Sequence, residues 1–328
     1  MWVGEDLIRP DENSINDNAN VEIRTSLKSP LEYFYSFFDS YLIDLITSET
    51  NRYAMQKNET QMVSETDLRA LIGVLFLSGY VPLPRRKIYW ERERDAHNEQ
   101  LVTKAISRDK FDFVMKNIHF QDNNHLDTSD KFAKIRPLFQ HLNKTFLEHG
   151  KLELSHSVDE AMFPYYGRHG AKQFMKGKPI RDGYKLWMGT SRLGYVYWFE
   201  PYQGISTNIS VSYAEYGVGA GVVLEYADAI RKKWPVESIH LFFDNIFTSI
   251  PLIELLTQKK FYATGTVREN RLPDNPLVNS KSFKKEERGS YDYKKISDQN
   301  IVAVKWNDNS LVNLCSNYAG IEPIHNVK

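Results

Sequence analysis

Hydrophobic residues recur at helical spacing through the first half of the chain. In the stretch LEYFYSFFDSYLIDLITSE the apolar positions share one helical face, and Ser29 and Pro30 stand where an N-cap and a first turn are expected. Ser64 before LRALIGVLFLSGY and Ser107 before RDKFDFVMKNIHF are further candidate N-caps. The pattern therefore predicts a mainly helical domain over residues 29–150.

The spacing of hydrophobic residues changes after Gly150. The runs LELSHSVD, YKLWMGTS and GYVYWFEP are short, rich in β-branched and aromatic residues, and typical of three consecutive antiparallel strands. A helix over GVGAGVVLEYADAIRKKW, a strand at ESIHLFFD, a helix over SIPLIELLTQKK and a strand at FYATGTV follow. Alternating strands and helices imply right-handed crossovers in one sheet. Residues 151–267 should thus form a mixed sheet with helices, of the α/β class and α+β when the whole chain is considered.

The two ends of the chain have patterns of their own. Residues 1–28 are rich in Asn and Asp, and we expect a flexible lead-in because they offer little apolar surface to bury. After Arg268 the runs SYDYKKI, NIVAVKW and SLVNLCS predict strands joined as hairpins. We expect residues 268–328 to form a separate small β module rather than to continue the sheet.

Composition narrows the classes of function. Lys plus Arg and Asp plus Glu both number 42, so no global charge draws the molecule toward nucleic acid, and any polyanion site must be a local patch. The single cysteine, Cys315, excludes an internal disulfide and a cysteine zinc cluster within these residues. No apolar run reaches the roughly eighteen residues of a membrane span, and the first residues lack the order of a signal peptide. The expected compartment is intracellular, with no membrane partner.

Two aspartates occupy similar places in the predicted sheet. Asp159 ends LELSHSVD and Asp244 ends ESIHLFFD, and in mixed α/β sheets ligands collect at the carboxyl ends of strands. Two carboxylates on one rim can hold the divalent cations that assist phosphoryl transfer. Both residues also fit as caps or turn residues, and on spacing alone that interpretation is the stronger one.

The sequence around both aspartates carries a resemblance. SVDEAMFPYYGRHGAKQFMKGKPIRDGYKLW resembles the first catalytic block of piggyBac transposases, in which Asp-Glu at a strand end is followed by a Gly-Arg turn, a Lys-Pro pair and a Gly-X-Lys strand. LFFDNIFTSIPLIELLTQKKFYATGTVREN resembles the second block. The blocks occur in the family's order, and the resemblance extends over about residues 30–328, through GYVPLPRRKIYW, KKEERG and KWNDNS.

The resemblance implies a fold, a chemistry and partners. Members of this family have a ribonuclease-H-like catalytic domain with three aspartates, an inserted β domain, and flanking helices for dimerisation and DNA binding. By resemblance, Asp159 and Asp244 are the first and second ligands of Mg²⁺ or Mn²⁺ in DNA cleavage and strand transfer. DNA and a second copy of the chain are the expected partners, and the nucleus is the expected compartment.

The sequence departs from the family's pattern at the third aspartate. It follows the inserted domain in a Gly-Gly-Val-Asp-type block, whereas the sequence here closes on GIEPIHNVK. Asp292, Asp298 and Asp308 are poor substitutes, since they fall in the predicted β module. The chain is therefore expected to be a partial or remnant form that does not cut DNA by itself. The alternative is a domesticated, non-catalytic module that binds DNA or protein.

Basic residues cluster next to Asp159 in the sequence. Aromatic residues are interleaved with them, which is a pattern suited to phosphate backbones. The competing interpretation is a solvated hairpin face whose lysine stems cover apolar surface. The residues predicted to bind DNA are Arg168, Lys172, Lys176, Lys178, Arg181 and Lys185.

Overall fold

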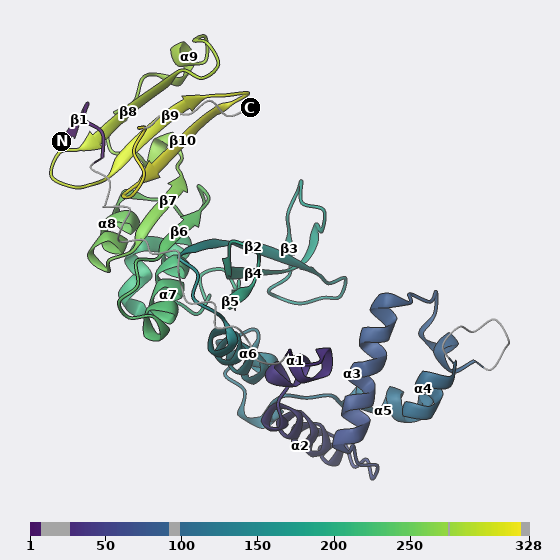
Figure 1. The fold of residues 1–328 in the computed structure, drawn as a ribbon. Helices are drawn as coiled ribbons and strands as arrows, with labels where there is room; N and C mark the ends of the chain where they lie inside the picture. The colour runs from purple at the N-terminus through teal and green to yellow at the C-terminus, as the bar shows by residue number, and fades with distance from the viewer. Residues whose placement is uncertain (8–26, 92–98, 275, 323–328) are drawn as a thin grey trace. The chain divides into compact units, whose positions relative to one another are not determined.

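The computed structural model describes residues 1–7, 27–91, 99–274 and 276–322, which divide into two compact units (Figure 1). Ser26–Thr145 form the helical unit. The remaining residues, up to Thr25 and from Phe146 onward, form the sheet unit.

The helical unit confirms the prediction of a mainly helical first half. The predicted caps are in place, since the side chains of Ser29, Ser64 and Ser107 each accept a hydrogen bond from a backbone N–H of the following first turn. Short 3-10 helices lie at Arg86–Trp90, Asn123–His125 and Ala133–Ile135. The α-helices in this region are α1 (Pro30–Phe37), α2 (Ser40–Gln56), α3 (Glu65–Tyr80), α4 (Glu99–Ala105), α5 (Arg108–Asn117) and α6 (Arg136–His149).

Apolar side chains of α2, α3 and α5 form the core of this unit. Leu42 and Ile43 from α2, Leu71 from α3, and Phe111 and Val114 from α5 are all at most 1% exposed. Burial of side chains of this kind is worth about 1.5–3 kcal/mol each before conformational entropy is counted. The core therefore depends mainly on α2, α3 and α5, with Val102 added from α4, whereas no residue of α1 is buried.

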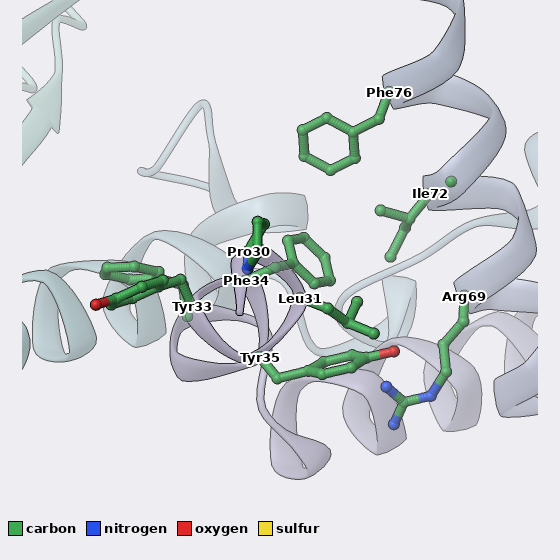
Figure 2. A pocket seen from close by; sticks show the side chains of 10 residues that line it. Pro30, Leu31, Tyr33, Phe34, Tyr35, Arg69, Ile72 and Phe76 are labelled. Atoms are coloured by element: carbon green, nitrogen blue, oxygen red, sulfur yellow. The ribbon is translucent and has the colours of Figure 1, made fainter. Parts of the chain in front are cut away.

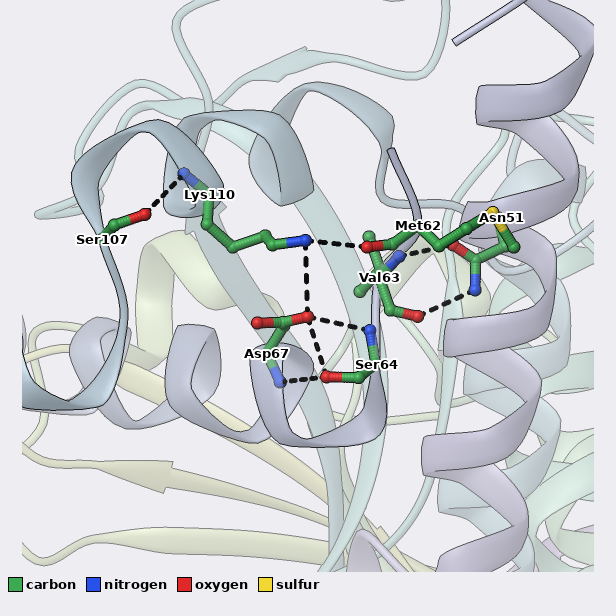
Figure 3. A network of polar contacts seen from close by, with 7 residues as sticks. All are labelled: Asn51, Met62, Val63, Ser64, Asp67, Ser107 and Lys110. Carbon is green, nitrogen blue, oxygen red and sulfur yellow. Dashed lines mark hydrogen bonds and ion pairs between the residues drawn. The ribbon is translucent and has the colours of Figure 1, made fainter. Parts of the chain in front are cut away.

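A polar network fixes the connection between α2 and α3 (Figure 3). The Asn51 amide exchanges two hydrogen bonds with the backbone of Val63, at 2.8 and 2.7 Å. From α5, Lys110 Nζ donates to Met62 O at 2.7 Å and lies 3.6 Å from an Asp67 carboxylate oxygen. Burial opposes ionisation of Asp67, but hydrogen bonds from Ser64 and the charge of Lys110 together lower its pKa. Residues 62–67 are thus held from two helices at once.

One mixed sheet runs through the sheet unit (Figure 1). Its path through the described residues is β1-β8-β9-β10-β7-β6-β2-β4-β3, with β5 paired to β4 beside that path. The strands are β1 (Trp2–Val3), β2 (Ser155–Pro164), β3 (Gln173–Phe174), β4 (Asp182–Ser191), β5 (Val196–Pro201), β6 (His240–Phe243), β7 (Tyr262–Thr266), β8 (Tyr291–Ile296), β9 (Val302–Asn307) and β10 (Leu311–Ser316).

The central strands follow the predicted order of elements. β2, β4 and β5 are consecutive antiparallel neighbours, and β6 and β7 join them in parallel pairing. The crossovers are α7 (Gly217–Lys233) and α8 (Ile250–Gln258), whose buried side chains share a core with those of β6 and β7. Gly189 allows α7 to approach β4, because a Cβ there would lie 2.3 Å from the ring of Tyr226. The predicted strands and crossover helices are confirmed.

The segment after Arg268 differs from the prediction. Its three strands form, but β10 pairs antiparallel with β7, so the strands continue the sheet and the expectation of a separate module is wrong. Two further elements precede them, a 3-10 helix at Glu269–Arg271 and α9 (Ser280–Phe283). The physical reason is that β7 would otherwise leave a row of backbone N–H and C=O groups unpaired.

The first residues also differ from the expected flexible lead-in. Trp2 and Val3 pair with Ile296 and Lys295 of β8, and Leu7 is buried. The Asp6 carboxylate accepts hydrogen bonds from the backbone of Ile321. Burial of two apolar side chains and a strand edge outweighs the polar composition here. The Asn-rich stretch behind the prediction lies within 8–26, outside the described residues.

Candidate functional site

Asp159 and Asp244 lie on adjacent parallel strands. The last paired positions of β2 and β6 are Val158 and Phe243, and each aspartate follows its strand's paired residue by one position. Side chains alternate between the two faces of a sheet, so both aspartates point to the same face as Ser157 and Phe242. Neighbouring strands are about 4.8 Å apart. The two carboxylates therefore project from neighbouring positions on the same face of the sheet.

One detail of the predicted geometry is wrong. Asp159 is not at the end of its strand, since β2 continues to Pro164 in an antiparallel ladder with β4. What ends at Val158 is the pairing with β6. Asp159 therefore lies where β2 loses its β6 neighbour and stays paired with β4 alone, and the residue is exposed.

Each carboxylate has one oxygen occupied by a local hydrogen bond. Asp159 Oδ1 accepts from the backbone N–H of Glu160 at 2.7 Å, and Asp244 Oδ1 accepts from that of Ile246 at 2.7 Å. Asp244 is thus also a turn residue, as the competing interpretation proposed. Within the described part of the chain, neither Oδ2 has a hydrogen bond or an ion pair. One oxygen of each aspartate is free to bind something else.

The electrostatics around Asp159 favour a cation. Asp159 is exposed as a residue, but partial burial of its carboxyl raises the pKa, and the negative charges of Glu160 and Asp244 raise it further against the hydrogen bond from the Glu160 backbone. Glu160 Oε1 is paired with Lys178 Nζ at 3.1 Å, and the Glu160 side chain is only 4% exposed. Its buried Oε2 has no hydrogen-bond partner. Three carboxylates near two ammonium groups, those of Lys178 and Lys185, leave one negative charge that a bound cation would offset.

The donor set fits an open divalent-cation site. Mg²⁺ is usually bound by one or two carboxylates together with water and phosphate oxygens, and Asp159 with Asp244 supply such a pair. Among the residues that the structure describes, no group of three or more His, Cys, Asp or Glu is arranged to hold a metal ion. The residues therefore suit a cation shared with phosphate oxygens and not a cage made by protein alone.

The three weaker aspartate candidates all have local partners. Asp292 accepts from the backbone N–H of Val278 at 2.6 Å, and Asp298 from Ser297 Oγ at 2.9 Å. Asp308 is paired with Arg288 at 2.6 Å. They stabilise turns and strand ends of the β8–β10 region.

Sequence reasoning did not identify Arg271, which supports the turn after Asp244. Its Nη1 donates to the carbonyl oxygens of Asn245, Ile246 and Thr248 at 2.9–3.0 Å. Gly219 of α7 packs against the same turn, where a Cβ would lie 2.8 Å from Ile246 O. Two distant segments thus orient Asp244. The only signal in the sequence was an arginine in a polar stretch, which does not reveal its acceptors.

The structure divides the six basic residues predicted to bind DNA into two groups. Lys178 is paired with Glu160, Lys172 is 3.4 Å from Asp182, and the ammonium of Lys185 lies 3.7 Å from the Trp187 ring centre. Burial lowers the pKa of Lys185. In contrast, Arg168, Lys176 and Arg181 are exposed and have no ion pair among the described residues. We call these three the exposed cations.

Comparison with known proteins agrees with the fold. The family model described as "Transposase IS4" matches residues 29–328. Human "PiggyBac transposable element-derived protein 2" is 43% identical over 326 residues, which is 99% of this chain and 54% of that protein. Human "PiggyBac transposable element-derived protein 3" is 42% identical over 324 residues, again 54% of its length. The chain therefore spans about half the length of these relatives.

A solved structure shares the fold. The piggyBac transposase in a cryo-EM synaptic complex with hairpin DNA superposes with a TM-score of 0.74 at 22% identity, covering 92% of this chain and 63% of that one. Together with the mixed sheet, these matches place the chain among the transposases with a ribonuclease-H-like core. It belongs to the Transposase IS4 family, and its relatives there are of the piggyBac type.

The family's chemistry is DNA cleavage and transfer, and a DDE-type transposase family implies use of a divalent metal ion. None of the described helices is long and apolar enough to cross a membrane.

Proposed function

We propose that this chain binds a divalent cation, Mg²⁺ or Mn²⁺, through Asp159 and Asp244 and uses it to hold a DNA phosphate. The observation that carries the proposal is the shared face and neighbouring register of the two aspartates, each with an oxygen left free. When bound, a cation of this kind stabilises the developing charge on phosphate oxygens during transfer.

Other residues of the chain position Asp244, balance charge beside the two aspartates and attract DNA. Arg271 and Gly219 keep the turn after Asp244 in one arrangement. Lys178 neutralises Glu160 beside the pair and is available to a phosphate when a cation replaces it. The exposed cations Arg168, Lys176 and Arg181 attract the DNA backbone without regard to sequence.

Cleavage needs more than these residues in our proposal. The resemblance implies a third aspartate, and no described carboxylate joins the pair. We therefore assign cation and DNA binding to the described residues, and strand transfer to these residues acting together with a third carboxylate. A nuclear location and assembly as a homodimer belong to the same proposal.

A non-catalytic role is the second candidate. The relatives' names describe proteins derived from transposable elements, and Lys178 already neutralises part of the acidic cluster. A chain that keeps the fold but has lost strand transfer would bind DNA with the same exposed cations.

Fluorescence anisotropy of a labelled duplex, with and without Mn²⁺, tests the proposal. The expected result is duplex binding that strengthens with Mn²⁺ in the wild type but not in Asp159→Asn or Asp244→Asn. Cation-independent binding that is identical in all three proteins would remove the cation site and leave the second candidate. A parallel cleavage assay in Mn²⁺ should give no product above a protein-free control. Cleavage abolished by Asp159→Asn would instead show that two aspartates suffice.

A further inference from the structure

An apolar groove lies between α1 and α3 in the helical unit (Figure 2). It has a volume of about 560 Å³, and every described residue that lines it belongs to one of these two helices. Leu31, Phe34 and Tyr35 contribute from α1, and Ile72 and Phe76 from α3. We call this the α1–α3 groove. It is remote in sequence from both aspartates.

The groove exists because α3 is apolar on two sides. Leu68, Leu71 and Val74 of α3 are buried in the core, while Ile72 and Phe76 project on another side. Among the described residues that line the groove, those facing them belong to α1, a helix of eight residues none of which is buried. Phe34 meets Phe76 edge to face at 5.6 Å, yet Phe76 remains 57% exposed and Leu31 59% exposed. A contiguous exposed apolar surface of this kind marks an interaction site more often than chance exposure.

One charged group marks an end of the groove. Arg69 is the only charged side chain among the described residues that line it. Its Nη2 is 3.2 Å from Glu65, and its guanidinium lies 4.9 Å from the centre of the Tyr35 ring (Figure 2). Among the described residues, one of its nitrogens pairs with an acid, Glu65, and the Tyr35 side chain forms a further hydrogen bond with the guanidinium. The remaining N–H groups of the guanidinium fork can therefore receive a carboxylate from outside.

The size of the groove decides what kind of occupant fits. Ten residues line it, whereas a standard interface between two folded proteins uses about 20–30 residues on each side. Its volume falls in the range of about 300–1,000 Å³ that holds a single compact ligand or a few anchoring side chains. A helix that inserts residues i, i+3 or i+4, and i+7 matches such a shape.

We propose that the α1–α3 groove binds one amphipathic helix of a partner protein, whose apolar stripe packs on Phe34, Ile72 and Phe76 and whose acidic side chain pairs with Arg69. The interaction does not depend on the cation site, and it adds a protein-binding function to the proposed DNA-binding one.

Gly73 offers a way to fill the groove without disturbing the fold. It lines the groove from α3, and a Cβ at this position would meet no atom within 4 Å. Gly73→Leu therefore occupies the groove with its side chain, and replacement of glycine inside a helix favours folding. Gly79→Leu is the matched control, since Gly79 lies on the same helix, also has open space around a Cβ, and does not line the groove.

The probe is a fluorescein-labelled, end-capped peptide of about twelve residues, long enough for three helical turns. It carries Leu, Leu and Phe on one face and one Asp at the end that meets Arg69. In anisotropy titrations we expect saturable binding to the wild type and to Gly79→Leu, with binding to Gly73→Leu weaker by about tenfold or more. Arg69→Glu should weaken binding of this peptide and strengthen binding of a peptide in which Lys replaces Asp.

Two results would overturn the proposal. The first is absence of saturable peptide binding to the wild type, or equal binding to wild type and Gly73→Leu while circular dichroism shows both folded. The second comes from sedimentation velocity of the protein alone. A wild-type dimer that Gly73→Leu converts to a monomer would show that a second copy, and not a partner's helix, fills the groove.

Discussion

The aspartate pair, Asp159 and Asp244, and the six basic residues predicted to bind DNA differ in how the structure leaves them available to a ligand. The two aspartates keep one free oxygen each on a shared face. Of six basic residues, by contrast, Lys172 and Lys178 are paired with acids of the chain, and Lys185 lies against Trp187. Clustered charge in a sequence therefore overstates what a surface offers to a ligand, because neighbouring strands bring counter-charges that sequence order does not reveal.

The difference has a structural cause. Strand register brings Asp159 and Asp244 together, and register is set by the hydrophobic alternation of β2 and β6. Lys172 and Lys178 extend from loops, where long side chains pair with the nearest acid, whereas Lys185 lies within β4 and packs on Trp187. Strand register thus determines the positions of the two aspartates. Ion pairing with nearby acids determines which of the lysines remain available to a ligand.

Of the changes considered, Arg271→Ala should have the largest effect. It tests whether the turn after Asp244 is held rigidly. Its Nη1 satisfies three backbone carbonyls of the turn after Asp244, and their loss should cost about 2–3 kcal/mol of unfolding free energy. Urea unfolding followed by tryptophan fluorescence measures this.

The control is Arg268→Ala, which loses one exposed hydrogen bond to Asn245 Oδ1 and should cost less than about 1 kcal/mol. Equal costs for the two variants would mean that the turn does not depend on Arg271.

Removal of the exposed cations tests whether they, and not the paired lysines, bind DNA. Arg168, Lys176 and Arg181 changed together to Ala should reduce the slope of log K against log salt for duplex binding by about 3, roughly one per lost phosphate contact. The matched triple is Lys172, Lys178 and Lys185 changed to Ala, which should reduce the slope by less because these cations are already engaged.

Equal slopes for the two triple variants would contradict the division between exposed and engaged cations. A salt titration of anisotropy over 50–200 mM covers the range in which such contacts change affinity.

Lys178→Met should strengthen cation binding by about threefold to tenfold. Lys178 is the cation nearest to Glu160 and is close enough to both aspartates for their charges to raise its pKa after the contribution of Glu160. Without it, the carboxylates keep only Lys185 as a nearby positive charge, and a divalent ion binds them more tightly. Isothermal titration with Mn²⁺ measures the change, and Lys176→Met is the control that should leave affinity unaltered. Unchanged Mn²⁺ affinity in Lys178→Met would place Lys178 outside the cation's surroundings, and weaker binding would contradict competition between Lys178 and the cation.

Asp159→Asn should give the smallest effect, a rise in stability of a few tenths of a kcal/mol at pH 7 without metal. Burial and two neighbouring carboxylates raise the folded-state pKa of Asp159, so its ionised form destabilises the fold. The penalty sets in as pH rises above the unfolded pKa of about 3.9 and is complete above the folded pKa. It remains small because the side chain is partly exposed and solvent screens its charge.

Thermal unfolding at pH 7 and near pH 3.5 checks the sign. The gain should appear at pH 7 and disappear at the lower pH. A loss of stability at pH 7 would show that Asp159 is stabilising in the absence of a cation.

Much of the fold could be predicted from the sequence because local patterns were unambiguous. The period-2 runs of β2, β4 and β5, the caps at Ser29, Ser64 and Ser107, and the crossovers α7 and α8 all follow from residue spacing. Pairing between distant segments was not predictable in this way. Nothing in SLVNLCS indicates that it pairs with FYATGTV, and nothing in the first residues indicates pairing of Trp2 with β8.

The same limit applies to the candidate site. The identity of Asp159 and Asp244 came from the motif, and their shared face came from alternation along two parallel strands. Arg271 and Gly219 could not be found, because their contacts are backbone carbonyls about 25 residues away in sequence. The pairing of Lys178 with a nearly buried Glu160 also needed the strand geometry.

Mn²⁺ binding to the wild-type protein, Asp159→Asn and Asp244→Asn is the most direct test of the central claim that the two aspartates form one cation site. Titration followed by electron paramagnetic resonance of free Mn²⁺ should show a site in the wild type that each single variant weakens by about tenfold or more, since either change removes one of two carboxylate ligands. Asp182→Asn, whose carboxylate pairs with Lys172, should bind as the wild type does. Mn²⁺ affinity that is unchanged in both single variants, or absent in the wild type, would contradict the claim.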